Sequence, residues 1–259
     1  MRKPPPWLLM SFGMLLVLLL WVYAASSEVA QFGVVPTPQA TVVTLFDLMT
    51  RRPFWNDLLT TLYRMLVGFA ASMAVGIPLG VGIGLSQVLS GMFGGIINSL
   101  KYTPISAFIP LSILFFGVGD GQKVMVLLLA TGPYMAAMTA DAVRNTRIEH
   151  IESALTLGAS RWQIISRVIL TSAAPQIWQA ARLSMAIAWT YVITAELVGA
   201  QTGLGRFLLR AERFFNTREM LAAVFVIAAI GWLSDLLFRL VYVRRFRWFV
   251  LMGQEQDSV

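Results

Sequence analysis

Six long apolar stretches make up most of this chain, and short polar segments separate them. They run over residues 7–25, 58–86, 92–116, 123–141, 172–199 and 219–242. A helix needs roughly 20 apolar residues to cross the hydrocarbon core of a bilayer, and each stretch is near that length or longer. Hydrophobic residues make up 57% of the chain and charged residues only 13%, whereas a soluble domain carries about a quarter charged residues. The sequence therefore predicts an all-α polytopic membrane protein with six transmembrane helices.

The residue types that are scarce exclude several classes of function. The chain has no cysteine, and its one histidine is His150. Disulfides and thiolate metal sites are therefore excluded, and little remains from which to build a metal centre or a hydrolase triad. The net charge of +7 comes from basic residues scattered along predicted helix ends, where they suit phospholipid headgroups. We expect membrane lipid as a partner, no nucleic acid, no bound metal and no enzymatic activity in this chain.

The first apolar stretch follows Arg2 and Lys3 and resembles a signal peptide in its basic start. It is longer than the roughly 7–15 apolar residues of a signal peptide, so we predict an uncleaved anchor helix over residues 1–34. The anchor and a basic cluster after the last stretch (Arg244, Arg245 and Arg247) predict that both termini are cytoplasmic. The predicted organisation is one transmembrane domain over 1–259, with an outer amphipathic helix over 35–50 and core helices over 58–242 that include a cytoplasmic loop over 142–171.

Small residues recur every four positions in the second stretch. They are Gly68, Ser72, Gly76, Gly80 and Gly84. This spacing places them on one helix face, where a neighbouring backbone can approach closely. We predict helix packing at Gly76, Gly80 and Gly84, and a glycine line beside a moving pathway remains the alternative.

Two prolines, Pro104 and Pro110, lie within the third stretch. Each removes a backbone hydrogen bond, and in a membrane the freed carbonyls need partners from protein or water. We therefore expect this span to lie in the interior. The following GVGDG turn (117–121) lacks the GxxxxGK[ST] spacing of a phosphate-binding loop and is not interpreted as one.

Two segments predicted to lie outside the membrane have amphipathic character. In 35–50, Thr37 is placed to cap a helix that begins with Pro38, and the apolar residues that follow predict a surface helix. Segment 201–218 mixes arginines with phenylalanines and leucines. It predicts an interfacial helix that faces either a periplasmic partner or lipid headgroups.

A polar segment over 152–175, ESALTLGASRWQIISRVILTSAAP, interrupts the apolar pattern. We predict two short helices joined at Gly158, since glycine permits the sharp turn. Glu152, near the predicted start, suits the helix dipole. A polar helical turn between two spans predicts a docking surface for a cytoplasmic partner, with an ordinary amphipathic loop as the alternative.

The same segment resembles the EAA motif of permease subunits of ATP-binding-cassette (ABC) importers. That motif is Glu-Ala-Ala, three residues, Gly, nine residues, then Ile-x-Leu-Pro. Here it reads Glu152-Ser153-Ala154, then Gly158, then Val168-Ile169-Leu170-Thr171. Ser153, Val168 and Thr171 depart from the motif, and the missing proline at Thr171 affects the junction between loop and helix.

Other segments resemble the taurine, sulfonate and nitrate branch of this superfamily of binding-protein-dependent inner-membrane components. They follow the branch in order and spacing along most of the chain: 35–38 (VPTP), 104–120, Leu157 to Ser160 with Trp162-Gln163, 195–197 (AEL) and 203–205 (GLG). No single one of these matches is decisive, and their shared order carries the resemblance.

The resemblance implies a type I importer permease fold and an assembly. Its members would be a second permease copy, cytoplasmic ATP-binding-cassette ATPase subunits and a periplasmic or lipid-anchored solute-binding protein. ATP and Mg²⁺ would be bound by the ATPase, and this chain would carry no cofactor. The resemblance assigns ATPase coupling to Glu152, Ser153, Ala154, Gly158, Ala159 and Ser160. It also implies import of a small anion across the inner membrane, such as a sulfonate, nitrate, bicarbonate or a carboxylate.

Five residues are candidates for the pathway or its gate: Tyr134, Arg182, Thr190, Thr194 and Glu196. Arg182 lies deep in the fifth stretch, where an ionisable residue suggests function. It could attract an anion, pair with Asp141 or reach the cytoplasmic interface, and the structural roles are favoured. Glu196 suits a gate or a packing hydrogen bond better than a ligand. An ion-coupled secondary transporter or channel subunit is the alternative function, although it would need more ionisable groups within the spans.

Overall fold

The computed structural model describes residues 5–26 and 35–249, and its regular elements are all helical. The five long helices are α1 (Pro6–Ser26), α3 (Arg52–Leu85), α6 (Asp120–Arg144), α9 (Leu170–Leu197) and α11 (Thr217–Arg245). The shorter ones are α2 (Pro38–Thr50), α4 (Gln87–Lys101), α5 (Ile109–Phe116), α7 (Ile148–Thr156), α8 (Arg161–Gln163) and α10 (Leu204–Arg213). The all-α prediction is confirmed. The predicted anchor over 1–34 lies partly outside the described residues, at 1–4 and 27–34.

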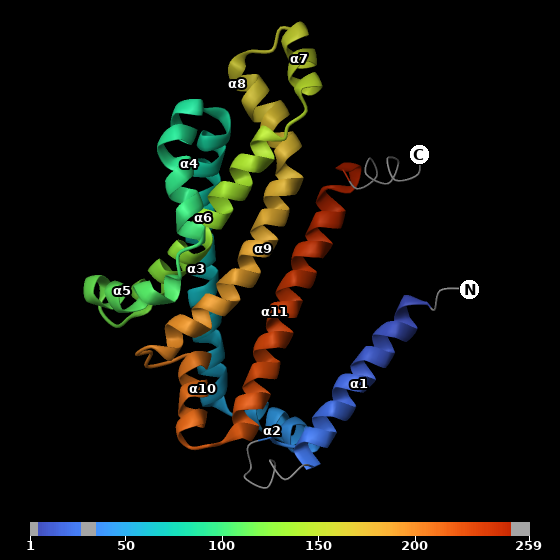
Figure 1. Ribbon diagram of the computed structural model, residues 1–259, viewed down its shortest axis with the longest axis vertical. Helices are drawn as coiled ribbons and strands as arrows, with labels where there is room; N and C mark the ends of the chain where they lie inside the picture. The colour runs from blue at the N-terminus through green and yellow to red at the C-terminus, as the bar shows by residue number, and fades with distance from the viewer. Residues whose placement is uncertain (1–4, 27–34, 250–259) are drawn as a thin grey trace.

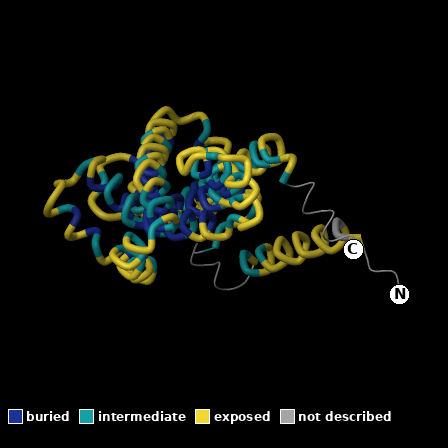
Figure 2. Tube along the Cα trace, turned by 90° about the horizontal axis from the view of Figure 1, so that it is seen from above, coloured by how far each residue is buried: buried dark blue, intermediate teal, exposed yellow. Residues whose placement is uncertain are grey.

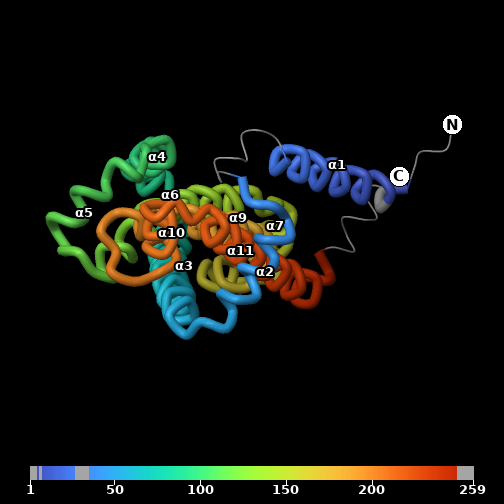
Figure 3. The backbone as a smooth tube through the Cα atoms, turned by 90° about the horizontal axis from the view of Figure 1, so that it is seen from below, coloured from blue at the N-terminus to red at the C-terminus, as the bar shows by residue number. Residues whose placement is uncertain are grey.

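The long helices run along the molecule, and the short ones gather at its two ends. Figure 1 shows α7 and α8 at one end, hereafter the elbow end, and α2 and α10 at the opposite or far end. The first residues of α1 and the last of α11 both point toward the elbow end (Figure 1). Seen from the far end (Figure 3), α10 lies beside α3, α9 and α11, which it contacts.

Six elements correspond to the six predicted spans. Among the described residues, α1, α3, α6 and α11 are long and apolar enough to cross a membrane, and α4 with 105–116 forms a fifth, bent candidate. Helix α9 has 28 residues, which makes it about 42 Å long at ~1.5 Å per residue. It packs against α3, α6 and α11, but it is too polar to be identified as a membrane span from its composition alone.

The predicted single helix over 92–116 is wrong. Helix α4 ends at Lys101, and the chain turns by 96° into 105–116. Pro104 causes the break, because it lacks a backbone N–H and holds the residue before it out of the helical region. Pro110 lies in the first turn of α5, where a proline is tolerated. Within this chain the segment is partly interior, since Ile105 and Ile109 are buried whereas Leu114 and Phe115 are 82% and 77% exposed.

The glycines of α3 face α6 along most of its length. A Cβ at Gly76 would lie 2.8 Å from the Cβ of Met135, and one at Gly84 would lie 2.7 Å from the Cβ of Val143. At Gly80 it would meet the Ala136 carbonyl. Because no side chain fits at these positions, the two backbones approach closely, which is the packing arrangement that the spacing predicts.

The buried core lies where α3, α6 and α9 meet. Met65, Leu127 and Met135 from α3 and α6 contact Trp189 and Val192 of α9 in one cluster. Figure 2 shows the buried residues concentrated there, whereas α1 is exposed along most of its length. Helix α1 joins the rest through Trp21, whose indole N–H donates to the Pro36 carbonyl at 3.0 Å and whose ring lies 5.6 Å from that of Phe225.

Both predicted surface helices are present at the far end. Helix α2 begins with Pro38, and the Thr37 hydroxyl accepts from the backbone N–H of Ala40 at 3.3 Å, so the predicted cap is confirmed. Helix α10 and the residues after it occupy the predicted interfacial segment. Phe214 and Phe215, directly after α10, are 78% and 89% exposed. The far end therefore exposes aromatic side chains.

Candidate functional site

The elbow, residues 148–163, is a sharp turn between two helices. Gly158 has φ +77°, and glycine is the residue that adopts this region without strain. Its N–H donates to the Leu155 carbonyl at 2.9 Å, and the Ala159 N–H donates to the Ala154 carbonyl at 3.0 Å. These two bonds form a Schellman motif, the usual end of a helix at glycine. The predicted turn at Gly158 is confirmed.

Helix α8 begins with a capping box at Ser160, two residues after the turn at Gly158. The Ser160 hydroxyl accepts from the Gln163 backbone N–H at 3.4 Å, and the Gln163 side chain accepts from the Ser160 N–H at 2.8 Å. Both orphan donors at this helix start are therefore satisfied. The turn of the elbow is held by hydrogen bonds within the elbow itself.

The predicted position of Glu152 near a helix start is wrong. Helix α7 begins at Ile148, so Glu152 lies mid-helix and the acidic residue of the first turn is Glu149. Glu152 and Ser153 are exposed, while Ala154 and Ala159 are half-buried and pack against an apolar cluster that includes Val143. The alanines therefore attach the elbow to the long helices and leave its other face free.

Apolar side chains that sequence reasoning missed project from the free face of the elbow. Leu155, Leu157 and Trp162 are 55%, 87% and 74% exposed. A Cβ at Gly158 would meet nothing within 4 Å. Exposed apolar groups beside open backbone are typical of an interaction surface.

The elbow continues directly into α9. A π-helical segment, Ile164–Ile169, follows α8, and the Leu170 N–H donates to the Ile165 carbonyl. Thr171 and Pro175 both lie inside α9 without a break. The missing motif proline at Thr171 therefore leaves the junction helical, and a movement of the elbow has a continuous route into α9.

At the far end, Glu196 of α9 lies in a buried polar cluster. It is fully buried, 2.8 Å from the Arg64 guanidinium, and its oxygens lie 2.9 and 3.0 Å from the Thr61 hydroxyl. The Gly205 backbone N–H donates to it at 2.9 Å. Glu196 thus has the contacts of the predicted packing partner.

Arg64 completes this cluster by joining three parts of the chain. Its Nε lies 2.6 Å from Asp120 of α6, and it donates to the Thr202 carbonyl at 2.7 Å as well as to Glu196. Arg64 falls within the predicted span over 58–86, and the sequence alone assigns it no role. Its burial, with 5% of its side chain exposed, is the signal that a polar partner had to exist nearby.

The turn between α9 and α10 is also held by this cluster. Gly203 has φ +112°, and a Cβ there would enter the Glu196 carboxylate. Its N–H donates to the Asp57 carboxylate at 2.8 Å. Glycine is required at position 203, because other residues rarely adopt this φ and a side chain would collide with Glu196. The GLG segment (203–205) therefore fixes the position at which α10 begins.

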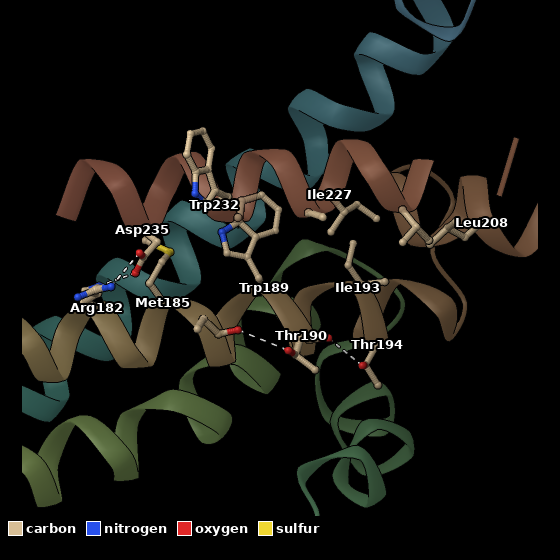
Figure 4. A pocket seen from close by; sticks show the side chains of 14 residues that line it. Arg182, Met185, Trp189, Thr190, Ile193, Thr194, Leu208, Ile227, Trp232 and Asp235 are labelled. Atoms are coloured by element: carbon tan, nitrogen blue, oxygen red, sulfur yellow. Dashed lines mark hydrogen bonds and ion pairs between the residues drawn. The ribbon is translucent and has the colours of Figure 1, made fainter. Parts of the chain in front are cut away.

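A cavity of about 540 Å³ lies between α9 and α11. Its lining residues include Arg182, Met185, Trp189, Thr190, Ile193, Thr194, Leu208, Ile227, Trp232 and Asp235. Figure 4 shows Arg182 and Asp235 together at one end, Thr190 and Thr194 toward the other, and the two tryptophans between them. The structure thus brings three of the five predicted pathway residues to one cavity.

Arg182 pairs with Asp235 instead of the predicted Asp141. Its guanidinium makes two contacts with that carboxylate, through Nε and, at 2.8 Å, through Nη2. Asp141 instead lies 4.0 Å from Arg144. Asp235 is on α11, 53 residues away from Arg182 in sequence, so helix periodicity could not have identified it.

The remaining predicted residues divide between this cavity and other places. The Thr190 and Thr194 hydroxyls donate to carbonyls one turn back in α9, at 3.4 and 2.8 Å, and both line the cavity. Tyr134 does not: its hydroxyl donates to the Lys101 carbonyl at 2.8 Å, joining α6 to the end of α4. Among the described residues, no group of His, Cys, Asp and Glu could hold a metal ion.

The sequence of the chain matches the model of a known protein family. The family model described as "Binding-protein-dependent transport system inner membrane component" matches residues 76–247, which include the elbow, the cavity and Glu196 of the buried cluster. The chain belongs to this family. It is an inner-membrane permease component of an ABC importer, a multi-pass subunit whose relatives are transport permeases.

The permease has relatives whose names are informative. It is 31% identical to the taurine transport system permease protein TauC of Escherichia coli K12, over 92% of this chain and 89% of that one. It is 30% identical to the aliphatic sulfonates permease SsuC of Bacillus subtilis 168, described as putative, over 90% and 84%. A bicarbonate permease, CmpB of Synechococcus elongatus, is 26% identical over 70% of the chain and 66% of its own length.

Solved structures share the fold of the permease. A chain of the MetNI methionine ABC transporter, in an inward-facing conformation, matches with a TM-score of 0.67 at 21% identity, over 74% of this chain and 98% of that one. An amino acid ABC transporter matches with a TM-score of 0.61 at 17% identity, over 80% and 96%. Both confirm the predicted importer permease fold.

Proposed function

We propose that the permease forms the translocation pathway of an ATP-driven importer for a small solute with an anionic group, such as a sulfonate, and that the elbow couples it to a separate ATPase. The observation that carries this proposal is the elbow itself. It is a rigid turn with exposed Leu157 and Trp162, open backbone at Gly158 and a continuous helical route into α9.

The coupling surface we propose includes the predicted residues Glu152, Ser153, Ala154, Gly158, Ala159 and Ser160. ATP and Mg²⁺ act in the ATPase, which closes on ATP binding and moves two elbows, one from each of two permease copies. Because α9 carries both the cavity and Glu196, an elbow displacement reaches the pathway and the far end through one helix. A periplasmic or lipid-anchored binding protein delivers the solute at the far end.

The proposed orientation places the elbow end in the cytoplasm. Seven arginines lie there, against six at the far end: Arg144, Arg147, Arg161, Arg167, Arg244, Arg245 and Arg247 against Arg51, Arg52, Arg206, Arg210, Arg213 and Arg218. Positive charge beside spans favours the cytoplasmic side, and this small excess agrees with the proposal that both termini are cytoplasmic.

Copurification tests the proposed assembly. A tagged permease coexpressed with its ATPase subunit should retain that subunit through detergent purification, and the complex should hydrolyse ATP. The permease purified alone should show no hydrolysis. ATP hydrolysis by the permease alone, or consistent loss of the ATPase from a monodisperse permease, would contradict the proposal.

A further inference from the structure

The charged wall of the α9–α11 cavity is open to its interior. The side chains of Arg182 and Asp235 remain 31% and 41% exposed although they pair with one another. Arg182 lies near the middle of α9, a 28-residue helix that packs against the membrane-length helices α3, α6 and α11. Accessible charges at this depth face a water-filled space or a protein surface in preference to lipid.

The opposite charges of this pair cancel, so the cavity carries both signs and no net charge at this end. Arg239 lies one helical turn from Asp235 but does not line the cavity. A simple anion that approached Arg182 would also meet the Asp235 carboxylate, which repels it. A molecule with both charges satisfies each wall residue, because an acidic group suits the planar fork of arginine and an ammonium group suits a carboxylate.

We propose that the α9–α11 cavity is a binding site for a small zwitterion, with the acidic group of the solute on Arg182 and its ammonium group on Asp235. The proposal rests on the importer function proposed above and narrows its solute class to molecules that also carry a cation. Inorganic anions such as nitrate and bicarbonate lie outside this class.

The other walls suit the remainder of such a molecule. Trp189 and Trp232 lie between the charged end and the threonines (Figure 4). Their rings can cover an apolar linker and attract an ammonium group. The volume, about 540 Å³, falls within the ~300–1,000 Å³ range of small-molecule sites.

The ion pair is not the only attachment between α9 and α11. The Trp178 indole N–H donates to the Phe238 carbonyl at 3.0 Å, and Ile227 and Phe238 pack against the core cluster that contains Trp189. Because these contacts hold α11 against α9, Arg182 and Asp235 can release each other and bind the charged groups of a solute without detaching α11.

Weak binding to the permease–ATPase complex in nanodiscs, measured by saturation-transfer NMR, tests the proposal. Three probes are compared. Taurine carries both charged groups, ethanesulfonate carries only the sulfonate, and ethylamine carries only the ammonium group. Taurine should bind most tightly. Asp235→Asn should weaken taurine roughly tenfold and leave ethanesulfonate unchanged or tighter, while Arg182→Gln should weaken both.

This split separates a binding role from a structural one. If the pair only held α11 in place, Asp235→Asn would change the binding of taurine and ethanesulfonate alike or of neither, which would overturn the proposal. Arg51→Gln, at an exposed pair at the far end, is the control and should change nothing. If a variant fails to fold, equal binding of the three probes to the native complex overturns the proposal. Retention of the ATPase with no preference for taurine would refute this site and leave the importer function intact.

Discussion

Gly158→Asp should abolish solute uptake while the permease remains in the membrane at its normal level. The φ of +77° at Gly158 imposes roughly 1–2 kcal/mol of strain on another residue. No atom of the described chain lies within 4 Å of the new Cβ, so the fold should survive. An unpaired charge buried against the ATPase costs about 3–5 kcal/mol, which weakens association about 100-fold or more. ATP-dependent uptake in proteoliposomes measures the effect.

The chain offers a matched control for this variant. Gly117 also has a positive φ, +68°, and also has nothing within 4 Å of its Cβ position. Gly117→Asp adds the same charge outside the elbow and at least as much strain, because a ψ of −177° places Gly117 in a region that essentially only glycine adopts. It should nevertheless leave ATPase retention unchanged. Normal uptake by Gly158→Asp at normal expression would remove the elbow from the coupling interface.

Arg64→Ala should be the most destabilising single replacement in the far-end cluster. It leaves Glu196, which is fully buried, without its cationic partner, and removal of one partner from a buried ion pair costs about 3–5 kcal/mol. The apparent melting temperature in detergent should fall by roughly 10 °C. Scanning fluorimetry of the purified permease measures this shift.

Arg51→Ala is the control for Arg64, because Arg51 also faces two carboxylates. It contacts Asp47 and lies 2.7 Å from Glu219, but its side chain is 45% exposed. The hydrogen bonds that Arg51 donates to Glu219 and, with a smaller effect, to Asp47 raise the pKa of Arg51. Water nevertheless screens exposed pairs and leaves them worth about 0–1 kcal/mol. Equal melting temperatures for the two variants would show that the buried cluster contributes no more than a surface pair.

Sequence reasoning worked where local patterns decide the structure. The apolar stretches located the long helices, and the four-residue spacing of Gly76, Gly80 and Gly84 indicated a packing face. Gly158 marked the turn of the elbow because its backbone requirement is local. Sequence reasoning failed at Pro104, because it placed Pro104 and Pro110 within one span, whereas the chain turns by 96° there.

Partners distant in sequence could not be found in this way. Arg182 pairs with Asp235 and Arg64 with Glu196, and each pair depends on how long helices are arranged in space. The exposed face of the elbow was also missed, because the motif directs attention to Glu152 and the small residues. Leu157 and Trp162 become visible as surface residues only when the turn is built.

The central claim, that the elbow docks on the ATPase, can be tested most directly by crosslinking. The chain has no cysteine, so Leu157→Cys creates a single reactive site on the elbow, where this side chain is 87% exposed. Phe215→Cys, equally exposed at 89%, places the same group at the far end. With a bifunctional thiol reagent and the assembled complex, we expect an ATPase adduct from residue 157 and none from residue 215. An ATPase adduct from residue 215, with none from residue 157, would contradict it.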